Sequence, residues 1–226
     1  MVQLRKDPLI SGQCYHVFNR SIAGFVICND ALEYDRLLEL LDLHRFANFQ
    51  YRFAMFSQLS EELQQEIRRT LLEKSDFLVE IIAYCLMPTH FHLILKQVAE
   101  NGITRYISRV FNSFSKYFNA KHHRQGPLWS GHFRNVLVSD DRQLLHLSRY
   151  VHLNPTSAKL VDNPEIWRFS SLNEYLRSKS NSNIICNYRD SLETSPAKYR
   201  NFVYDQKDYQ RRLSQIKSLL MDDYTG

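Results

Sequence analysis

The sequence predicts an α+β fold: an antiparallel sheet of about four or five strands with helices packed on one face. Two observations lead to this class. Apolar runs at strand spacing intermix with helical patterns along residues 15–160. The clearest strands, residues 79–87 and 90–96, are joined only by a Pro-Thr turn, a connection that antiparallel neighbours allow and parallel ones do not.

The first part of the chain predicts a hairpin followed by two helices. Residues 15–20 (YHVFNR) and 25–28 are short apolar runs with a Gly-containing turn between them. Asp30 can cap a helix over residues 31–46, where leucines recur at helical spacing. Residues 59–73 have a second helical pattern.

The central part predicts one long helix, one strand and one capped helix. Residues 103–120 carry an apolar face at helical spacing, and residues 133–138 (FRNVLV) have the pattern of a strand. Ser139 can cap the next helix. That helix should run to about Leu153 and end or kink there, because Pro155 disfavours helical geometry at the residue before it.

The domain organisation follows from where these patterns weaken. Residues 1–176 are predicted to form the core domain, with an acidic helical insertion at about 50–75. Residues 177–226 are predicted to form a helical C-terminal appendage. Short helices are expected at residues 171–179 and 209–221.

Composition and charge narrow the class of function. No run approaches 18 apolar residues and the N-terminus lacks the apolar core of a signal peptide, so we expect a cytoplasmic protein. The four cysteines include no CxxC pair, which argues against a zinc ribbon. Residues 30–100 hold 12 acidic and 7 basic side chains, whereas residues 101–160 hold 9 basic and 2 acidic ones. A basic segment of this kind fits a nucleic-acid partner or a merely solvated face.

Two histidines on one predicted strand form the first candidate site. Side chains alternate between the faces of a strand, so His90 and His92 share a face about 7 Å apart, while Phe91 points into the core. Two imidazoles at that spacing can bind one divalent metal ion. The alternative is a pair of half-exposed structural histidines.

Tyr150 and Asn154 form the second candidate site. They lie four residues apart, so on a helix they share a face, beside the apolar stripe and partly exposed. A phenol with an amide one turn away could be a nucleophile next to a metal ligand, although a structural role is commoner for any single tyrosine. His152 lies on another side of this helix and is not expected to be a ligand.

Basic and aromatic side chains interleave along residues 103–134, and they form the third candidate site. Basic groups neutralise phosphates, and exposed aromatic rings stack on unpaired bases. Most phenylalanines here should belong to the core, whereas Tyr106 is expected to contact nucleic acid. The other candidate contacts are Arg105, Arg109, Lys121, His122, His123, Arg124, Trp129 and Arg134.

Several separated segments together resemble a known family. They are YHVFNR (15–20), LMPTHFHLIL (86–95), GPLWSGHFRNVLV (126–138), LSRYVHLNPTSAKLV (147–161) and WRFSSLNEYL (167–176). In this order they resemble the single-tyrosine HUH transposases of the IS200-like superfamily, and especially the REP-associated tyrosine transposases. The resemblance covers about residues 10–176 and leaves out the insertion and the tail.

The resemblance implies a ferredoxin-like (RRM-like) sheet that carries His90 and His92, and a helix that places Tyr150 opposite them. It implies that His90, His92 and Asn154 hold Mg²⁺ or Mn²⁺. Tyr150 would cleave single-stranded DNA with hairpin-forming or palindromic ends, and leave a 5′-phosphotyrosine and a free 3′-OH that can rejoin. It also implies a prokaryotic, nucleoid-associated protein that is either a monomer or a homodimer.

Two other functions stay open on the sequence. A non-catalytic nucleic-acid-binding protein of the same fold would keep the basic segment but would not need the paired histidines. A metal-dependent hydrolase would use water as its nucleophile and would form no covalent link to a tyrosine.

Overall fold

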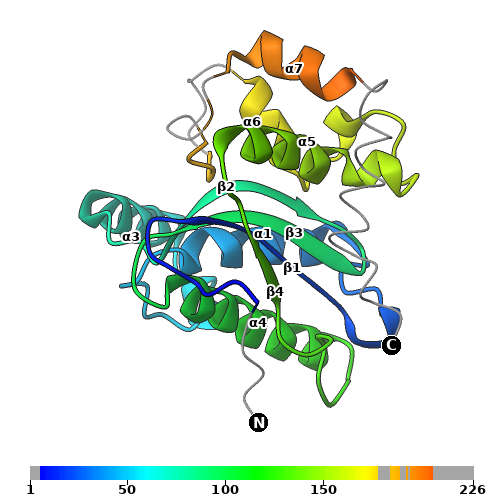
Figure 1. The fold of residues 1–226 in the computed structure, drawn as a ribbon. Helices are drawn as coiled ribbons and strands as arrows, with labels where there is room; N and C mark the ends of the chain where they lie inside the picture. The colour runs from blue at the N-terminus through cyan, green and yellow to red at the C-terminus, as the bar shows by residue number, and fades with distance from the viewer. Residues whose placement is uncertain (1–5, 178–183, 189–191, 193, 206–226) are drawn as a thin grey trace.

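The computed structural model describes residues 6–177, 184–188, 192 and 194–205, which form one antiparallel sheet with helices on both faces (Figure 1). The strands are β1 Cys14–Arg20, β2 Val79–Leu86, β3 His90–Gln97 and β4 Arg134–Leu137. The helices are α1 Ala31–His44, α2 Phe53–Phe56, α3 Glu61–Lys74, α4 Gly102–Lys121, α5 Asp141–Ser157, α6 Leu172–Leu176 and α7 Pro196–Tyr204. Two 3₁₀ turns are η1 Ile22–Gly24 and η2 Pro164–Ile166.

The strand order confirms the predicted fold class. The order is β2-β3-β1-β4, and every neighbouring pair is antiparallel. Helix α1 connects β1 to β2 and helix α4 connects β3 to β4, so each crossover passes over one strand of the sheet. This is the ferredoxin-like arrangement, to which α5, α6 and α7 are added.

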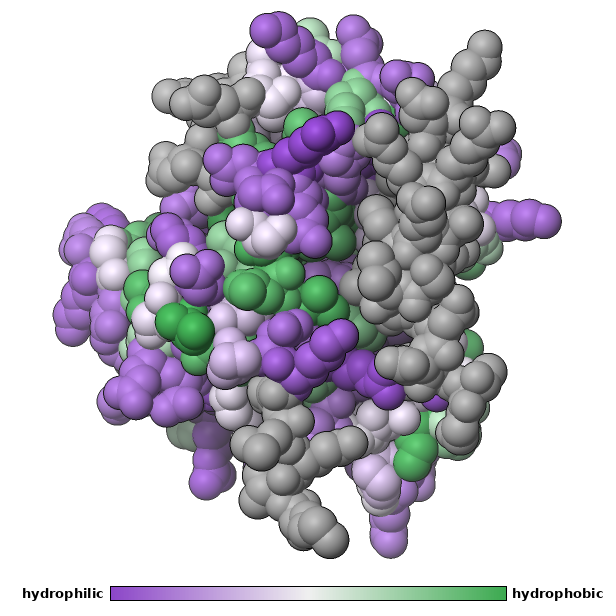
Figure 2. Space-filling model, viewed as in Figure 1, coloured by the Kyte–Doolittle hydropathy of each residue, from purple (hydrophilic) through white to green (hydrophobic). Residues whose placement is uncertain are grey.

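The helices cover both faces of the sheet, which corrects the expectation of a single covered face. Helices α1 and α4 pack together on one face, and α5 crosses the other (Figure 1). Within β3, Phe91 contacts Phe111 of α4, and the next residue, His92, contacts Tyr150 of α5. Because both faces are covered, most of β2 and β3 is buried. In Figure 2, hydrophobic residues show mainly at the level of the sheet, between hydrophilic helical layers.

The predicted hairpin of residues 15–20 and 25–28 is wrong in its second strand. Residues 25–28 form no strand, and the backbone N–H groups of Ile27 and Cys28 donate to the carbonyl of Pro88. The reason is the central position of β1, whose two edges are occupied by β3 and β4. A hairpin partner next to β1 therefore has no free edge to pair with.

Helix α5 differs from its prediction at both ends. Its N-cap is Asp140 instead of Ser139, and the Asp140 carboxylate accepts a backbone N–H of the first turn. The helix continues through Pro155, which lies in the last turn, where its missing N–H removes only one hydrogen bond. The Asn154 Nδ2 donates to the Tyr150 carbonyl at 2.9 Å, so the two residues keep helical register.

The remaining differences between the predicted and observed helices lie in the insertion at about residues 50–75 and in the residues after 170. Helix α3 follows the predicted helix closely and is capped by Ser60, and the short α2, which precedes it, is additional. Helix α6 covers the start of the helix expected at residues 171–179, and α7 is additional. The helix expected at residues 209–221 lies outside the described residues. Each described helix is too short or too polar to cross a membrane.

Candidate active site

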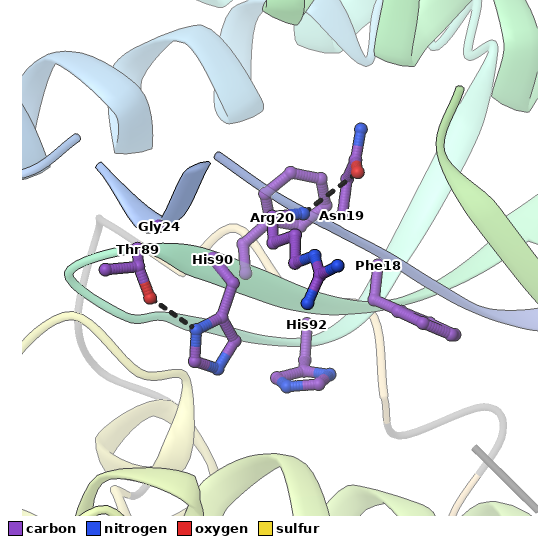
Figure 3. Close-up of a pocket in the computed structure, with 8 residues that line it drawn as sticks. Phe18, Asn19, Arg20, Gly24, Thr89, His90 and His92 are labelled. Atoms are coloured by element: carbon purple, nitrogen blue, oxygen red, sulfur yellow. Dashed lines mark hydrogen bonds between the residues drawn. The ribbon is translucent and has the colours of Figure 1, made fainter. Parts of the chain in front are cut away.

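Two histidines of β3 project from the same face of the sheet (Figure 3). His90 is half-buried and lines a pocket together with Arg20 and Thr89, whereas His92 is only 3% exposed. The centroids of the two imidazoles lie 5.2 Å apart, at an interplanar angle of 88°. Phe91, between them in sequence, packs on the opposite face, as strand alternation requires.

Each of the two rings is held at its Nδ1 atom. Thr89 Oγ1 lies 3.0 Å from His90 Nδ1, and His16 Nε2 lies 3.0 Å from His92 Nδ1. The Nε2 atom of His92 is buried and has no hydrogen-bond partner among the residues that the structure describes. A buried nitrogen without a partner costs free energy, so packing alone does not explain this histidine.

Burial keeps these imidazoles neutral at physiological pH. It lowers the pKa of His16 to about 3 and the pKa of His90 to about 4. Burial, with smaller contributions from the two neighbouring histidines, lowers the pKa of His92 well below its ordinary value. A neutral imidazole keeps a lone pair on one ring nitrogen, which is the form that binds a metal ion.

Tyr150 of α5 packs against the ring of His92. Its ring meets the ring of His92 edge to face, with 5.4 Å between the centroids. The side chain is 4% exposed, which corrects the expectation of a partly exposed residue: the apolar stripe of α5 and Tyr150 both turn toward the sheet. Burial raises the pKa of Tyr150, and a hydrogen bond from the Asn154 side chain partly lowers it.

The donor set fits a divalent cation. Neutral imidazole nitrogens and an amide oxygen are metal ligands, and His92 Nε2 is a buried atom that lacks a partner. In the described part of the chain, no three His, Cys, Asp or Glu side chains gather to hold a metal ion. Further ligands to an ion held by His90 and His92 would therefore be other groups, such as an amide oxygen, water or a phosphate oxygen.

The opposite side of α5 packs against Ser171 and helix α7. His152 is fully buried, with its Nδ1 2.7 Å from Tyr199 Oη and its Nε2 2.7 Å from Ser171 Oγ. The Arg149 guanidinium lies over the ring of Phe202 and donates to its carbonyl at 3.0 Å. These contacts occupy both ring nitrogens of His152, in agreement with the expectation that it is no metal ligand.

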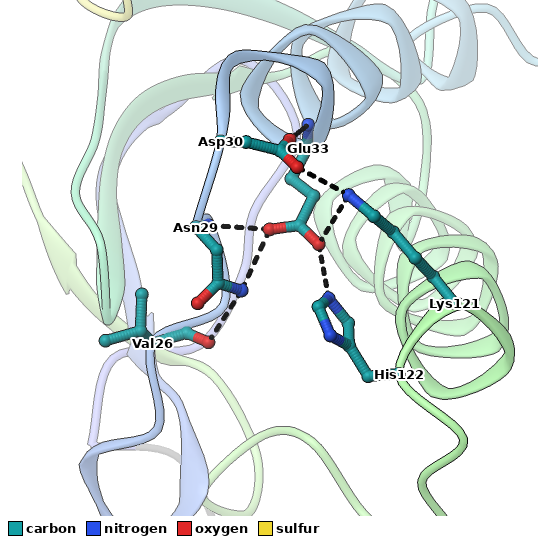
Figure 4. Close-up of polar contacts among 6 residues, drawn as sticks. All are labelled: Val26, Asn29, Asp30, Glu33, Lys121 and His122. Atoms are coloured by element: carbon teal, nitrogen blue, oxygen red, sulfur yellow. Dashed lines mark hydrogen bonds and ion pairs between the residues drawn. The ribbon is translucent and has the colours of Figure 1, made fainter.

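Most of the predicted DNA-binding residues lie on α4 or in the segment that follows it, and α4 covers the face away from Tyr150. Lys121 Nζ lies 2.8 Å from Asp30 and 3.0 Å from Glu33, and His122 also bonds to Glu33 (Figure 4). Burial raises the pKa of Glu33, but hydrogen bonds from Asn29, His122 and Lys121 bring it below its ordinary value. The charge at the end of α4 is thus neutralised by the start of α1.

The other predicted contacts on this side also have partners within the fold or lie outside the site. Arg109 donates to the carbonyls of Phe46 and Ala47, and Arg124 donates to the side chain of Asn119 and to the carbonyl of Pro127. Arg105 and His123 are exposed.

The structure corrects the expectation that two aromatic rings of this segment are exposed. Trp129 is buried against Phe91 and Phe111, and Tyr106 is fully buried with its hydroxyl donating to the Leu41 carbonyl. Neither ring is available for stacking on a base in this conformation. Helical and loop aromatics of an amphipathic segment enter the core when a sheet lies beneath them.

Arg134 is the predicted DNA contact that shares a face with the histidines. It pairs with Phe18 of β1, and Phe18 pairs with His92, so all three side chains lie on the α5 face. The sequence reasoning missed His16 and Arg20 on that face. Alternation along the segment YHVFNR could have found them, because residues 16, 18 and 20 must share one side of the strand.

The chain is similar in sequence to one known family and in fold to a solved transposase. The sequence model of the IS200-like transposases matches residues 38–154, about half of the chain, and a comparison with curated protein sequences gives no match. A solved REP-associated tyrosine transposase bound to a REP hairpin has 15% identity and a TM-score of 0.50, over 83% of this chain and 94% of that one. A candidate transposase from Deinococcus radiodurans has 15% identity and a TM-score of 0.35, over 67% and 95%. The match of the family's sequence model and the predicted ferredoxin-like fold together establish that the chain belongs to the IS200-like transposase family and is a DNA transposase.

Proposed function

We propose that the protein is a metal-dependent transposase that cleaves and rejoins single-stranded DNA through Tyr150. The observation that carries this proposal is the contact between the Tyr150 and His92 rings, at 5.4 Å between centroids. It brings a phenol next to the neutral imidazole of His92, and His90 projects from the same face of the sheet beside His92 (Figure 3). A nucleophile beside candidate metal ligands is the arrangement that phosphoryl transfer needs.

In the proposed reaction, the Oη of Tyr150 attacks the scissile phosphorus, and the bond from phosphorus to the 3′ oxygen breaks. The phenol loses its proton and the departing 3′ oxygen gains one, so the products are a 5′-phosphotyrosine and a free 3′-OH. A 3′-OH of another strand reverses the step, because a phenol with a pKa near ~10 is a reasonable leaving group. Since burial raises the pKa of Tyr150, its proton leaves only as the new bond forms.

His90, His92 and Asn154 are the proposed ligands of Mg²⁺ or Mn²⁺. A bound divalent cation supplies positive charge that stabilises the phosphoryl oxygens during attack. The two histidines contribute neutral ring nitrogens. The Asn154 amide is kept one turn from the phenol by its hydrogen bond to the Tyr150 carbonyl.

The proposed substrate is single-stranded DNA with hairpin-forming or palindromic ends. Membership of a transposase family supports a DNA substrate, and the similar solved transposase is bound to a REP hairpin. We propose that Arg134 contacts phosphates beside the site, and that the six basic or histidine candidates on and after α4, without the buried Trp129, contact DNA outside it. The protein would act at the nucleoid, in the cytoplasm of a prokaryotic cell, as a monomer or homodimer with residues 1–176 as its catalytic domain.

Incubation of labelled single-stranded DNA with the protein and Mn²⁺, followed by denaturing gel electrophoresis, tests the proposal. We expect a covalent adduct with the wild type and none with Tyr150→Phe, while DNA binding on a native gel stays within a few-fold. Tyr204→Phe, which removes a surface hydroxyl of α7, is the matched control and should keep the adduct. Cleaved DNA without an adduct would indicate a hydrolase, and a native-gel shift alone would indicate a non-catalytic binder.

A further inference from the structure

His16 lies in the centre of the sheet, next to His92, and no part of the proposed reaction uses it. It is 1% exposed, and its ring stacks on the ring of His92 with 5.2 Å between the centroids and 16° between the planes. The Tyr150 ring meets it edge-on at 6.1 Å. A histidine in such a place carries a polar ring into the core of the protein, which costs free energy unless the ring has a role.

His16 is placed to orient a ligand and not to serve as one. Among the described residues, His16, His90 and His92 are not grouped closely enough to hold a common metal ion. The atom of His16 that approaches the site, Nε2, is instead 3.0 Å from His92 Nδ1. His16 therefore contacts Nδ1 of the His92 ring and leaves Nε2 open. Among the described residues, neither His92 Nε2 nor His16 Nδ1 has a hydrogen-bond partner.

The direction of the hydrogen bond between the two rings determines which nitrogen of His92 carries the proton. A hydrogen bond between two ring nitrogens holds one proton, so two arrangements exist. If His16 Nε2–H donates, His92 is protonated on Nε2 and cannot bind a cation there. If His92 Nδ1–H donates, its Nε2 keeps a lone pair, and His16 carries its own proton on Nδ1.

The neighbouring histidine shows the same arrangement. His90 Nδ1 lies 3.0 Å from Thr89 Oγ1, a hydroxyl oxygen that can accept a hydrogen bond from the Nδ1–H group (Figure 3). Both candidate ligands thus have Nδ1 engaged by another side chain, as metal-ligating histidines almost always do. Here the partner of one of them is a second histidine, which can accept through Nε2 only as its Nδ1–H tautomer.

We propose that His16 is a positioning residue for the metal site: it accepts the Nδ1–H of His92 and so fixes the ring orientation and the tautomer in which His92 binds a divalent cation through Nε2. The inference rests on the proposed function, because it needs His92 to be a ligand. It adds a residue of β1 that does not itself touch the cation or the DNA.

Mn²⁺ binding, measured by electron paramagnetic resonance without DNA, tests the inference. We expect His16→Leu, which has similar bulk and no acceptor, to raise the Kd for Mn²⁺ about 10–100-fold. His16→Gln places an amide oxygen near the former Nε2 and should restore affinity to within about threefold of the wild type. His44→Leu replaces a buried histidine of α1 that packs on Phe49 and should leave the Kd unchanged.

The outcomes separate the inference from the proposed function. If the wild type binds no Mn²⁺ and His90→Ala changes nothing, the metal site itself is wrong. If the wild type binds Mn²⁺ and a folded His16→Leu binds it equally well, His16 has only a structural role.

Nitrogen-15 NMR of the wild type labelled at histidine, saturated with Mg²⁺, needs no variant. We expect the His92 ring to carry its proton on Nδ1, with the shift of a coordinated nitrogen at Nε2. A His92 protonated on Nε2 under these conditions would overturn the inference, even if His16→Leu failed to fold.

Discussion

Glu33 and His92 are buried polar residues on opposite faces of the sheet, and they differ in how their polar atoms are satisfied. On the α4 face, the carboxylate of Glu33 is completely buried and receives hydrogen bonds from Lys121, His122 and Asn29, so its charge is compensated. On the α5 face, His92 is almost as deeply buried but keeps an unpaired Nε2, in contact with Tyr150. A satisfied network such as that of Glu33 stabilises the fold, whereas a buried nitrogen without a partner costs free energy unless it binds a ligand. Both ring nitrogens of His44, in α1, also have no partner among the described residues, so the contact of His92 with Tyr150 is what distinguishes it.

The comparison also shows what a basic segment means once it is folded. Residues 101–160 are strongly basic in sequence. Within them, the end of α4 is paired with the acidic start of α1, while Arg134 is exposed on the face of the histidines. The charge of a stretch of chain therefore differs from the charge of the surface that it forms, because residues distant in sequence contribute to that surface.

Removing a candidate ligand should have the largest effect. His90→Ala should reduce Mn²⁺-dependent DNA cleavage by more than about 100-fold, since losing a ligand exceeds the 10–100-fold typical of losing a ligand's hydrogen-bond partner. His92→Ala should do the same. Initial rates across an Mn²⁺ titration measure it, with His44→Ala as the control for loss of a buried histidine. Unchanged Mn²⁺ titration curves for both variants would mean that His90 and His92 have only a structural role.

On the α4 face, we expect a loss of stability and not of activity. Glu33→Ala should lower the free energy of unfolding by about 2–3 kcal/mol, because it removes a buried acceptor from three donors. Asp35→Ala, which breaks an exposed pair with Arg168, should cost less than about 1 kcal/mol and is the control. Urea denaturation measures both, and cleavage per folded molecule should stay as in the wild type.

The Glu33 carboxylate should also make part of the free energy of unfolding sensitive to acid. The pKa of Glu33 is lowered in the folded protein, so its contribution is complete above the unfolded value of about 4.3 and is lost as the pH falls below it. Glu33→Ala should lack that component. Equal acid sensitivity of the variant and the wild type would show that the Glu33 network does not stabilise the fold.

Asn154→Ala should have a smaller effect on cleavage than loss of either histidine, about tenfold. An amide oxygen is a neutral ligand that water can replace on a hard cation. Single-turnover cleavage rates at saturating Mn²⁺ measure it. A loss as large as that of His90→Ala would mean that water does not replace the amide oxygen, whereas an unchanged rate would mean that Asn154 is not a ligand.

The smallest expected effects concern DNA affinity. They compare the contribution of basic residues on the α5 face with that of basic residues at the end of α4. If Arg134 grips a phosphate, Arg134→Gln should flatten the log–log salt dependence of binding by roughly 0.7. If the loop after α4 binds DNA, Lys121→Gln with Arg124→Gln should flatten it by roughly 1.4. Because Arg134 lies on the face of the sheet that carries the histidines, whereas Lys121 lies at the end of α4 on the other face, we expect the double variant to change the slope less than Arg134→Gln. Fluorescence anisotropy at several salt concentrations decides between them.

Sequence periodicity by itself determined which candidate residues share a face. The two-residue period of β3 placed His90 and His92 together, and the helical period placed Asn154 one turn from Tyr150. The fold class also followed from local patterns, since the strands and crossover helices are long and strongly periodic. Helix and strand ends were less well predicted, as at Pro155, because capping and packing determine them.

Only the tertiary structure decided which of these local pieces meet. His16 and His92 are 76 residues apart in sequence and become hydrogen-bonded neighbours because β1 pairs with β3. Lys121 finds Asp30, 91 residues away, because α1 and α4 pack side by side. Period and composition describe a segment by itself, whereas the pairing of strands and the packing of helices depend on the whole chain, so the partner of each buried polar group could not be read from the sequence.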